Sequence, residues 1–292
     1  METMTELQSL IARHAARGRG EALPGLVLAV EPAPSVPIHR VYEPLLVIVA
    51  QGAKRIVLGD RVFESGAGQY LVIPLDLPVT SRVTEAREGA PYLAAALRLK
   101  PELVASLLLE STSGDRSSDE TSLIGVTRAP AELLDAVVRL LRLIDRPSDV
   151  AILQPMIERE IVWRLLSGDQ GGLVRQIGLA DSRLSKISYA TRWIREHYAE
   201  AVRIEELAER VAMSPTSFHR HFRAATAMSP LQYQKQIRLQ EARSRLMART
   251  DDVARIGFSV GYDSPSQFSR EYARLFGAPP SRDTAVLREA LS

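Results

Sequence analysis

The spacing of apolar residues changes character along the chain. Residues 1–20 predict a short amphipathic helix, because their apolar positions recur at helical spacing. From Gly25 onward the apolar residues gather in short β-branched runs (LVLAV, LLVIVAQG, KRIVLGDRVFES and GQYLVIP) separated by Gly, Pro and Asp. Such runs predict strands and hairpins, and Gly59-Asp60 predicts a two-residue hairpin turn. This part of the chain is therefore expected to form a β-sandwich or small barrel.

The pattern becomes helical again at PELVASLLLE, which begins at Pro101, and the polar stretch 111–122 predicts a surface loop. Residues 130–145 and 149–167 then predict two helices with broad apolar stripes. Such stripes form either the core of the chain or a seam between two copies, and the pattern leaves both open. We expect GDQGG at 168–172 to end the second helix and begin a linker of roughly ten residues.

Everything after Ser185 is helical by period and contains an internal repeat. SPTSFHRHFRAATAMSP (214–230) aligns without gaps on SPSQFSREYARLFGAPP (264–280), and each copy follows another short apolar helix. Each unit therefore reads as helix, short turn and helix, over residues 204–226 and 253–276. This is the helix-turn-helix pattern, in which the second helix lies in the major groove of DNA.

The same period divides each second helix into an inward and an outward face. Aromatic residues spaced i,i+4 are expected to anchor the helices inward: Phe218, Phe222, Phe268 and Tyr272. The outward positions carry side chains suited to base edges and phosphates. The candidate DNA-binding residues are Thr216, Ser217, His219, Arg220 and Arg223 in the first unit, and Ser266, Gln267, Ser269, Arg270 and Arg274 in the second. Any one of them alone indicates a solvated helix face, but the repeat of an outward arginine favours a DNA interface.

The segment between the two units, residues 231–248, predicts one long helix with a basic character. Its basic residues, with one just beyond it, are Lys235, Arg238, Arg243, Arg245 and Arg249. A rigid helix would fix the separation of the two helix-turn-helix units. Two such units about 34 Å apart could enter successive major grooves on one face of DNA.

Composition and charge support a division into two domains, 1–170 and 181–292. The chain has 292 residues, of which 46% are hydrophobic and 25% charged, enough for two ordinary globular cores. Residues 1–180 contain 19 basic and 22 acidic side chains, a net charge of −3, whereas residues 181–292 contain 18 basic and 13 acidic, a net charge of +5. The basic C-terminal part suggests a polyanionic partner.

Several functions are disfavoured by what the sequence lacks. Cysteine is absent, which excludes disulfides, thiolate-held zinc and cysteine nucleophiles. No apolar run is long enough for a membrane span and the N-terminus lacks the apolar core of a secretory signal, so we expect a cytoplasmic protein without a membrane partner.

A metal site or an active site is not expected either. Of the five histidines only His39 lies in the predicted barrel, and His219 and His221 diverge on their helix. No catalytic triad, paired carboxylates or phosphate loop stands out. The sequence therefore predicts no catalytic residues, no metal and no cofactor; the rival interpretation is a cupin enzyme with a DNA-binding tail.

Two stretches resemble a known family. GYDSPSQFSREYARLFGAPPS, together with SPTSFHRHF and SPLQYQKQIRLQEARSRL, is similar to the C-terminal DNA-binding domain of the AraC/XylS transcription regulators, and the resemblance covers residues 187–283. Two positions depart from the family pattern: Gly257 stands where alanine is usual, and Ala212 where glycine is frequent. Both keep a small side chain, so the fold expectation stands.

The N-terminal part resembles a module of one AraC subgroup. The match runs over residues 24–110, with PGL and YEPLLVIVAQGAKRIVLGDRVFESGAGQYLVIPLDLPVTS, and IEREIVWRLLSGDQGGLVRQI fits the same subgroup. The implied fold is α+β: a cupin-like β-barrel with flanking helices, followed by an all-α domain with two helix-turn-helix units. The implied role of the barrel is to bind an effector and dimerise.

The whole chain is thus expected to be a sequence-specific DNA-binding transcription regulator, and activation and repression both stay open. The expected partners are double-stranded DNA, RNA polymerase, a second copy of the chain and an unknown small organic effector. Candidate effector-binding residues are Tyr42, Glu43, Gln51 and Lys54. In the alternative, the barrel binds no small molecule and serves only for dimerisation or contact with polymerase.

Overall fold

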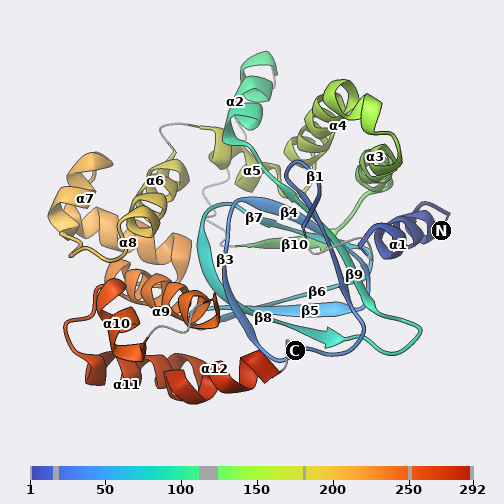
Figure 1. The fold of residues 1–292 in the computed structure, drawn as a ribbon. Helices are drawn as coiled ribbons and strands as arrows, with labels where there is room; N and C mark the ends of the chain where they lie inside the picture. The colour runs from blue at the N-terminus through green and yellow to red at the C-terminus, as the bar shows by residue number, and fades with distance from the viewer. Residues whose placement is uncertain (1, 16–19, 112–123, 180–181, 249–251, 290–292) are drawn as a thin grey trace. The chain divides into compact units, whose positions relative to one another are not determined.

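The computed structural model describes residues 2–15, 20–111, 124–179, 182–248 and 252–289 (Figure 1). The chain divides into two compact units, residues 1–188 and 189–292. The first unit contains both sheets, and the second is helical, so the α+β class is confirmed.

The strands form two antiparallel sheets. The first has the order β1-β2-β9-β4-β7-β10 and the second the order β3-β8-β5-β6. Among the described residues no ladder joins an edge strand of one sheet to the other, so the expected barrel is an open two-sheet arrangement. The strands are β1 (Glu21–Leu23), β2 (Leu26–Glu31), β3 (Ile38–Tyr42), β4 (Leu45–Gln51), β5 (Ala53–Leu58), β6 (Arg61–Gly66), β7 (Gln69–Ile73), β8 (Leu77–Glu85), β9 (Tyr92–Arg98) and β10 (Gly125–Arg128).

Local turn chemistry explains the predicted hairpin. β5 and β6 pair from Leu58↔Arg61 outward, with Gly59 and Asp60 between them. Gly59 has φ 60°, the left-handed value that the first position of a type II′ turn requires. The hairpin at Gly59-Asp60 is therefore confirmed.

Helix α1 (Glu2–Ala15) packs against the first sheet. It buries Leu7, Leu10 and Ile11 and packs on β2, β9, β4 and α3, as its apolar spacing predicts. The other helices of this unit are α2 (Pro101–Glu110), α3 (Ala131–Arg142), the 3-10 turn η1 (Leu143–Asp145), α4 (Pro147–Ser167) and α5 (Gly171–Gly178), while α6 (Arg183–Glu196) spans the boundary between the units. The polar stretch expected to be a surface loop lies almost wholly outside the described residues.

The two striped helices use their apolar residues differently. α3 buries Leu133, Val137 and Leu141 inside the unit. α4 buries Ile157, Ile161 and Leu165, but Ile152 and Met156 are 69% and 63% exposed. The stripe of α3 is therefore intrachain core, and α4 carries a second apolar face in solvent.

The linker expected after Gly168 is wrong in its first half. Residues 171–178 form helix α5, which packs against α2 and buries Leu173, Val174 and Ile177. Those three positions follow helical spacing, but the preceding GDQGG masks the signal, because two glycines are unfavourable at the start of a helix.

The second unit is built around one long central helix, α9 (Pro230–Ala248). It packs on α8, α10, α11 and α12. Around it lie α7 (Ile204–Arg210), α8 (Pro215–Thr226), α10 (Val253–Ser259), α11 (Pro265–Phe276) and α12 (Pro280–Glu289). The helix pairs α7–α8 and α10–α11 are two copies of one supersecondary unit, and the second pair shares a hydrophobic cluster with α9.

Candidate nucleic-acid interface and ligand cavity

Helices α8 and α11, the second helices of the two units, each start at a serine cap. The Ser214 hydroxyl oxygen accepts a hydrogen bond from the Ser217 backbone N–H at 3.3 Å, and the Ser264 hydroxyl from the Gln267 N–H at 3.4 Å. A proline follows each cap in the first turn, where its missing N–H is not needed. The starts of α8 and α11 are therefore fixed by the same local chemistry.

Aromatic anchors hold both helices inward. Phe218 and Phe222 in α8, and Phe268 and Tyr272 in α11, are fully buried, as their spacing predicts. The Phe222 ring meets Tyr233 of α9 edge-on at 5.5 Å. Because the anchors repeat every turn, the opposite face of each helix is left to solvent.

The turns of the two units differ in one residue type. Both turn positions have positive φ, 51° at Ala212 and 91° at Gly261.

Gly257, in helix α10 of the second unit, lies so close to the Phe268 ring that an added Cβ would approach it to 3.0 Å. Alanine, usual in the family at this position, would press on that ring.

The structure places most of the candidate DNA-binding residues in solvent. Eight are exposed: Thr216, His219, Arg220, Arg223, Ser266, Gln267, Arg270 and Arg274. The other two, Ser217 and Ser269, are partly buried. The outward face expected from the repeat therefore exists on both helices.

The arginines on this face are not neutralised by carboxylates of the described chain. Within the part of the chain that the structure describes, Arg223, Arg270 and Arg274 have no carboxylate within ion-pair distance. Arg220 has an imidazole as its neighbour, with its Nη2 3.5 Å from the Nε2 of His221. Exposed guanidinium groups without a carboxylate partner can donate hydrogen bonds to phosphates and to guanine edges.

The basic residues of α9, by contrast, are largely paired with other groups of the same chain. Arg243 makes a two-bonded ion pair with Asp283 at 2.8 and 3.0 Å, and Lys235 Nζ lies 3.0 Å from Glu271 Oε1. Arg245 Nε donates to Glu241 at 2.8 Å. Arg249, the last of the expected basic set, lies outside the described residues.

Arg238 of α9 connects two distant segments. It donates to the backbone carbonyl oxygens of Tyr198 at 2.6 Å, Glu200 at 2.9 Å and Gly261 at 2.7 Å. The carbonyls of Tyr198 and Glu200 precede α7, whereas Gly261 is in the turn between α10 and α11. Burial lowers the pKa of Arg238, and the surrounding acidic groups oppose that effect. This side chain is a structural bridge rather than a surface charge.

A cavity of about 290 Å³ lies between the two sheets of the N-terminal unit. Its wall on the first sheet comes from alternate residues of β2, β9 and β4, since successive strand residues point to opposite faces. Val27, Ala96 and Val47 form one row across the three strands, and Ala29 and Ala94 sit side by side in the next. The alanines leave the space that larger side chains would fill.

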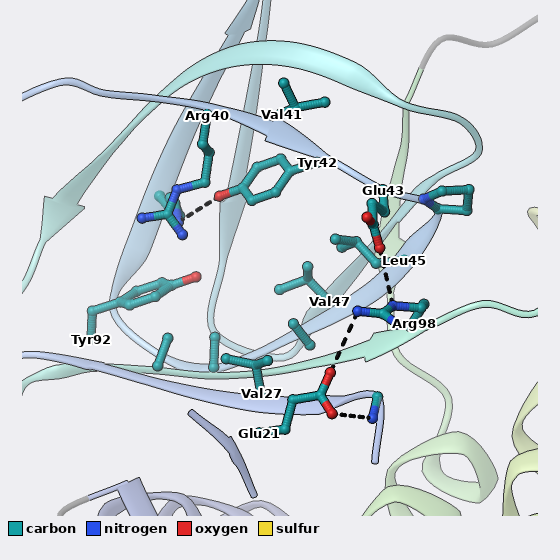
Figure 2. A pocket seen from close by; sticks show the side chains of 16 residues that line it. Glu21, Val27, Arg40, Val41, Tyr42, Glu43, Leu45, Val47, Tyr92 and Arg98 are labelled. Atoms are coloured by element: carbon teal, nitrogen blue, oxygen red, sulfur yellow. Dashed lines mark hydrogen bonds and ion pairs between the residues drawn. The ribbon is translucent and has the colours of Figure 1, made fainter. Parts of the chain in front are cut away.

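One end of the cavity is cationic. Lys54 Nζ donates to the Tyr42 hydroxyl oxygen at 3.0 Å and lies 5.7 Å and 5.9 Å from the ring centres of Tyr42 and Tyr92. Figure 2 shows the Arg40 guanidinium beside the Tyr42 hydroxyl. Burial raises the pKa of Tyr42. The positive charges of Lys54 and Arg40 act in the opposite direction and, with hydrogen bonds from Lys54 and Ser81, outweigh burial, so the net shift of this pKa is downward.

The opposite end places one guanidinium between two carboxylates. Arg98 lies 3.1 Å from a Glu43 carboxylate oxygen and 3.4 Å from Glu21 (Figure 2). Of the effector candidates, Tyr42, Glu43 and Lys54 line the cavity together. Gln51 does not: its side-chain amide donates to the Pro91 carbonyl oxygen at 2.8 Å.

Sequence reasoning missed part of this lining. Arg40, Tyr92 and Arg98 also face the cavity, as do the small residues of β9. The run YLAAALR contains the signal, because alanines at alternate positions of a strand, 94 and 96, predict a hollow on one face.

No group of three or more potential ligands (His, Cys, Asp or Glu) is arranged to hold a metal ion among the described residues. None of the described helices has the length and apolar character needed to cross a membrane.

Comparisons with known proteins agree with this architecture. Residues 22–173 match the family model of the AraC-type transcriptional regulator N-terminus, and residues 207–284 match a helix-turn-helix domain. The matching N-terminal model covers more than half of the chain. The chain therefore belongs to the AraC-type transcriptional regulators.

Similar proteins include activators and a solved regulator. The HTH-type transcriptional activator RhaS of Escherichia fergusonii is 30% identical over 155 residues, 52% of this chain and 55% of that protein. RhaS of Salmonella schwarzengrund is 29% identical over 167 residues, 56% of this chain and 58% of that protein. The matched region spans little more than half the length of these relatives.

Among solved structures, an apo form of ToxT of Vibrio cholerae that carries one substitution matches with a TM-score of 0.59 and 10% identity, over 90% of this chain and 98% of that chain. Wild-type ToxT bound to an unsaturated fatty acid matches with a TM-score of 0.58 and 10% identity, over 88% of this chain and 92% of that chain. At this identity the likeness concerns the fold.

Proposed function

We propose that this chain is a sequence-specific DNA-binding transcription regulator that reads DNA with α8 and α11. The observation that carries the proposal is the pair of equivalent, solvent-exposed arginines, Arg220 and Arg270, on two identically capped and anchored helices. Packing alone does not require an exposed arginine at both positions. The similarity to RhaS, an HTH-type transcriptional activator, supports a role in activating transcription, with RNA polymerase as a partner.

The outward face supplies two kinds of contact. An arginine in the major groove donates two hydrogen bonds to guanine O6 and N7, and a glutamine such as Gln267 pairs in the same way with adenine. Arg223 and Arg274, one turn further along each helix, are suited to phosphates. Phosphate contacts release counterions, so affinity should fall steeply as salt concentration rises.

The test is DNA binding of Arg220→Ala and Arg270→Ala in the full chain, measured on a panel of single-base variants of its site. Each substitution should cost about 1–3 kcal/mol and relax the preference at a different base, the two bases lying about 10 base pairs apart. Arg61→Ala, which removes an exposed arginine of β6, is the matched control and should leave binding unchanged. Equal affinity loss on every sequence would mean that both arginines contact only the backbone.

The N-terminal unit is proposed to bind a small organic effector in the cavity between its sheets. The mixed polar and apolar lining supports this role. So does the likeness of the fold to ToxT, because one structure of ToxT contains a bound unsaturated fatty acid. Effector binding would bias the unit between arrangements that engage DNA differently.

A second copy of the chain is the proposed partner of the exposed face of α4. Ile152, Met156 and Trp163 lie along that face and are 69%, 63% and 40% exposed. Arg159 and Glu160 beside them are already paired within the chain, with Glu110 and Arg139, so the exposed apolar side chains are the groups left to pair with a copy of this face about a two-fold axis.

A further inference from the structure

The two ends of the cavity between the sheets differ in charge. Its lining contains three cationic side chains, Arg40, Lys54 and Arg98, and two carboxylates, Glu21 and Glu43. Both carboxylates are ion-paired with Arg98. The remaining positive charge is therefore concentrated at the Arg40–Lys54 end.

That end lacks an internal counter-ion. Lys54 has the Tyr42 hydroxyl as its hydrogen-bond partner, and Arg40 has the Tyr42 ring at 5.9 Å. Within the described chain neither has a carboxylate at ion-pair distance. Glu31 pairs in register with Tyr92 but is not part of the lining. Two cations, of which Lys54 is partly buried, and a hydroxyl converge on one space and form a site for an anion, because an anion supplies the missing charge.

The middle of the cavity is apolar and small. Its walls are Val27, Ala29, Val47, Ala94 and Ala96, which offer no hydrogen-bonding side chains. A volume of about 290 Å³ lies at the lower limit for ligand pockets. These walls fit a compact hydrocarbon body and leave the several hydroxyls of a free sugar without partners, which is unfavourable.

We propose that the cavity binds a compact organic monocarboxylate, with its carboxylate between Arg40, Lys54 and the Tyr42 hydroxyl and its apolar body over the alanines of β2 and β9. The proposal deepens the effector role given above and rests on it for its regulatory meaning. The binding itself does not depend on DNA and is measured without it.

The probes are 3-phenylpropionate, its neutral amide and 3-phenylpropylamine, which share one apolar body and differ in the charge of the head group. Benzoate, phenylacetate, isovalerate and octanoate extend the set of carboxylates. Binding to the full-length protein is measured by isothermal titration calorimetry. We expect at least one carboxylate to bind, and its neutral amide to bind at least tenfold more weakly, which corresponds to about 1.4 kcal/mol.

Three variants locate the site. Lys54→Gln and Arg40→Gln should each reduce the preference for carboxylate over amide, whereas Ala29→Leu, which fills the apolar part, should weaken both ligands alike. Arg61→Gln removes an exposed cation of β6 outside the cavity and should change neither. Thermal denaturation of each variant verifies that it is folded; Arg40 is exposed, so its substitution keeps the test open if Lys54→Gln fails to fold.

The proposal is overturned if none of the carboxylates binds with a Kd below about 1 mM, or if the amide or the amine binds as tightly as the acid. It is also overturned if the preference survives in Lys54→Gln and Arg40→Gln. If the proposed DNA-reading function is wrong, Arg220→Ala and Arg270→Ala will bind DNA with wild-type affinity. The carboxylate binding measured by calorimetry does not depend on that result.

Discussion

Replacing Gly261 by alanine tests how α11, the second of the two helices proposed to read DNA, is positioned. Gly261 has φ 91°, which side-chain-bearing residues rarely adopt, and its added Cβ would lie 2.3 Å from the Ala199 carbonyl oxygen and 2.9 Å from Arg238 Cζ. The first obstacle is backbone, and the second is the centre of a guanidinium held by carbonyls on several sides. Neither can move without breaking hydrogen bonds.

The cost follows from these two contributions. A left-handed conformation costs a residue with a Cβ about 1–2 kcal/mol. Displacing Arg238 loses at least one hydrogen bond from a charged donor, about 1.5–3 kcal/mol. Gly261→Ala should therefore destabilise the C-terminal unit by roughly 2.5–5 kcal/mol and impair the α11 half of the proposed DNA recognition more than the α8 half.

The assay is urea unfolding followed by tryptophan fluorescence. The chain has two tryptophans, and Trp163→Phe leaves only Trp193, whose ring lies 5.5 Å from the Arg210 guanidinium within the C-terminal unit. Gly20→Ala is the control, because nothing lies within 4 Å of its added Cβ. A loss below about 1 kcal/mol, with unchanged preference at the bases read by α11, would refute the reasoning.

Three further outcomes are expected. Ala212→Gly relieves a left-handed alanine at φ 51° but adds freedom to the unfolded chain, so the urea midpoint should rise, by up to about 1 kcal/mol of stability; a fall would contradict the strain argument. Arg243→Met leaves Asp283 buried beside Tyr272 without its cation and should cost about 3–5 kcal/mol in the same assay, whereas Arg61→Met should cost almost nothing. Met156→Glu places a charge in the proposed seam of α4 and should convert a dimer to a monomer in sedimentation velocity; an unchanged dimer would place the seam elsewhere.

Local chemistry explains what the sequence predicted well. The caps at Ser214 and Ser264, the prolines after them and the i,i+4 aromatic anchors all act within one or two turns, so the repeat revealed α8 and α11 together with their outward faces. The Gly59 turn is equally local. These features require no knowledge of distant neighbours.

Features that depend on distant partners were harder to predict. The arginines of α9 look like a basic surface in the sequence, but Arg243 and Arg238 find their partners 40 and 23 residues further along the chain, at Asp283 and Gly261. The cavity depends on the register that sets β2, β9 and β4 side by side. Gln51 lies in the same strand as cavity residues, but a register shift after Val49 places it at the end of the ladder, where its side chain reaches Pro91.

The bridge made by Arg238 has a consequence for promoter architecture. It ties the segment before α7 to the turn before α11, so it restrains the two helix pairs relative to each other. One base pair inserted between two half-sites displaces the second by about 3.4 Å along the duplex. If α8 and α11 both bind DNA as proposed, this restraint opposes that displacement. For a regulator of the proposed kind, the spacing between half-sites is therefore as strict a part of the recognised sequence as the bases themselves.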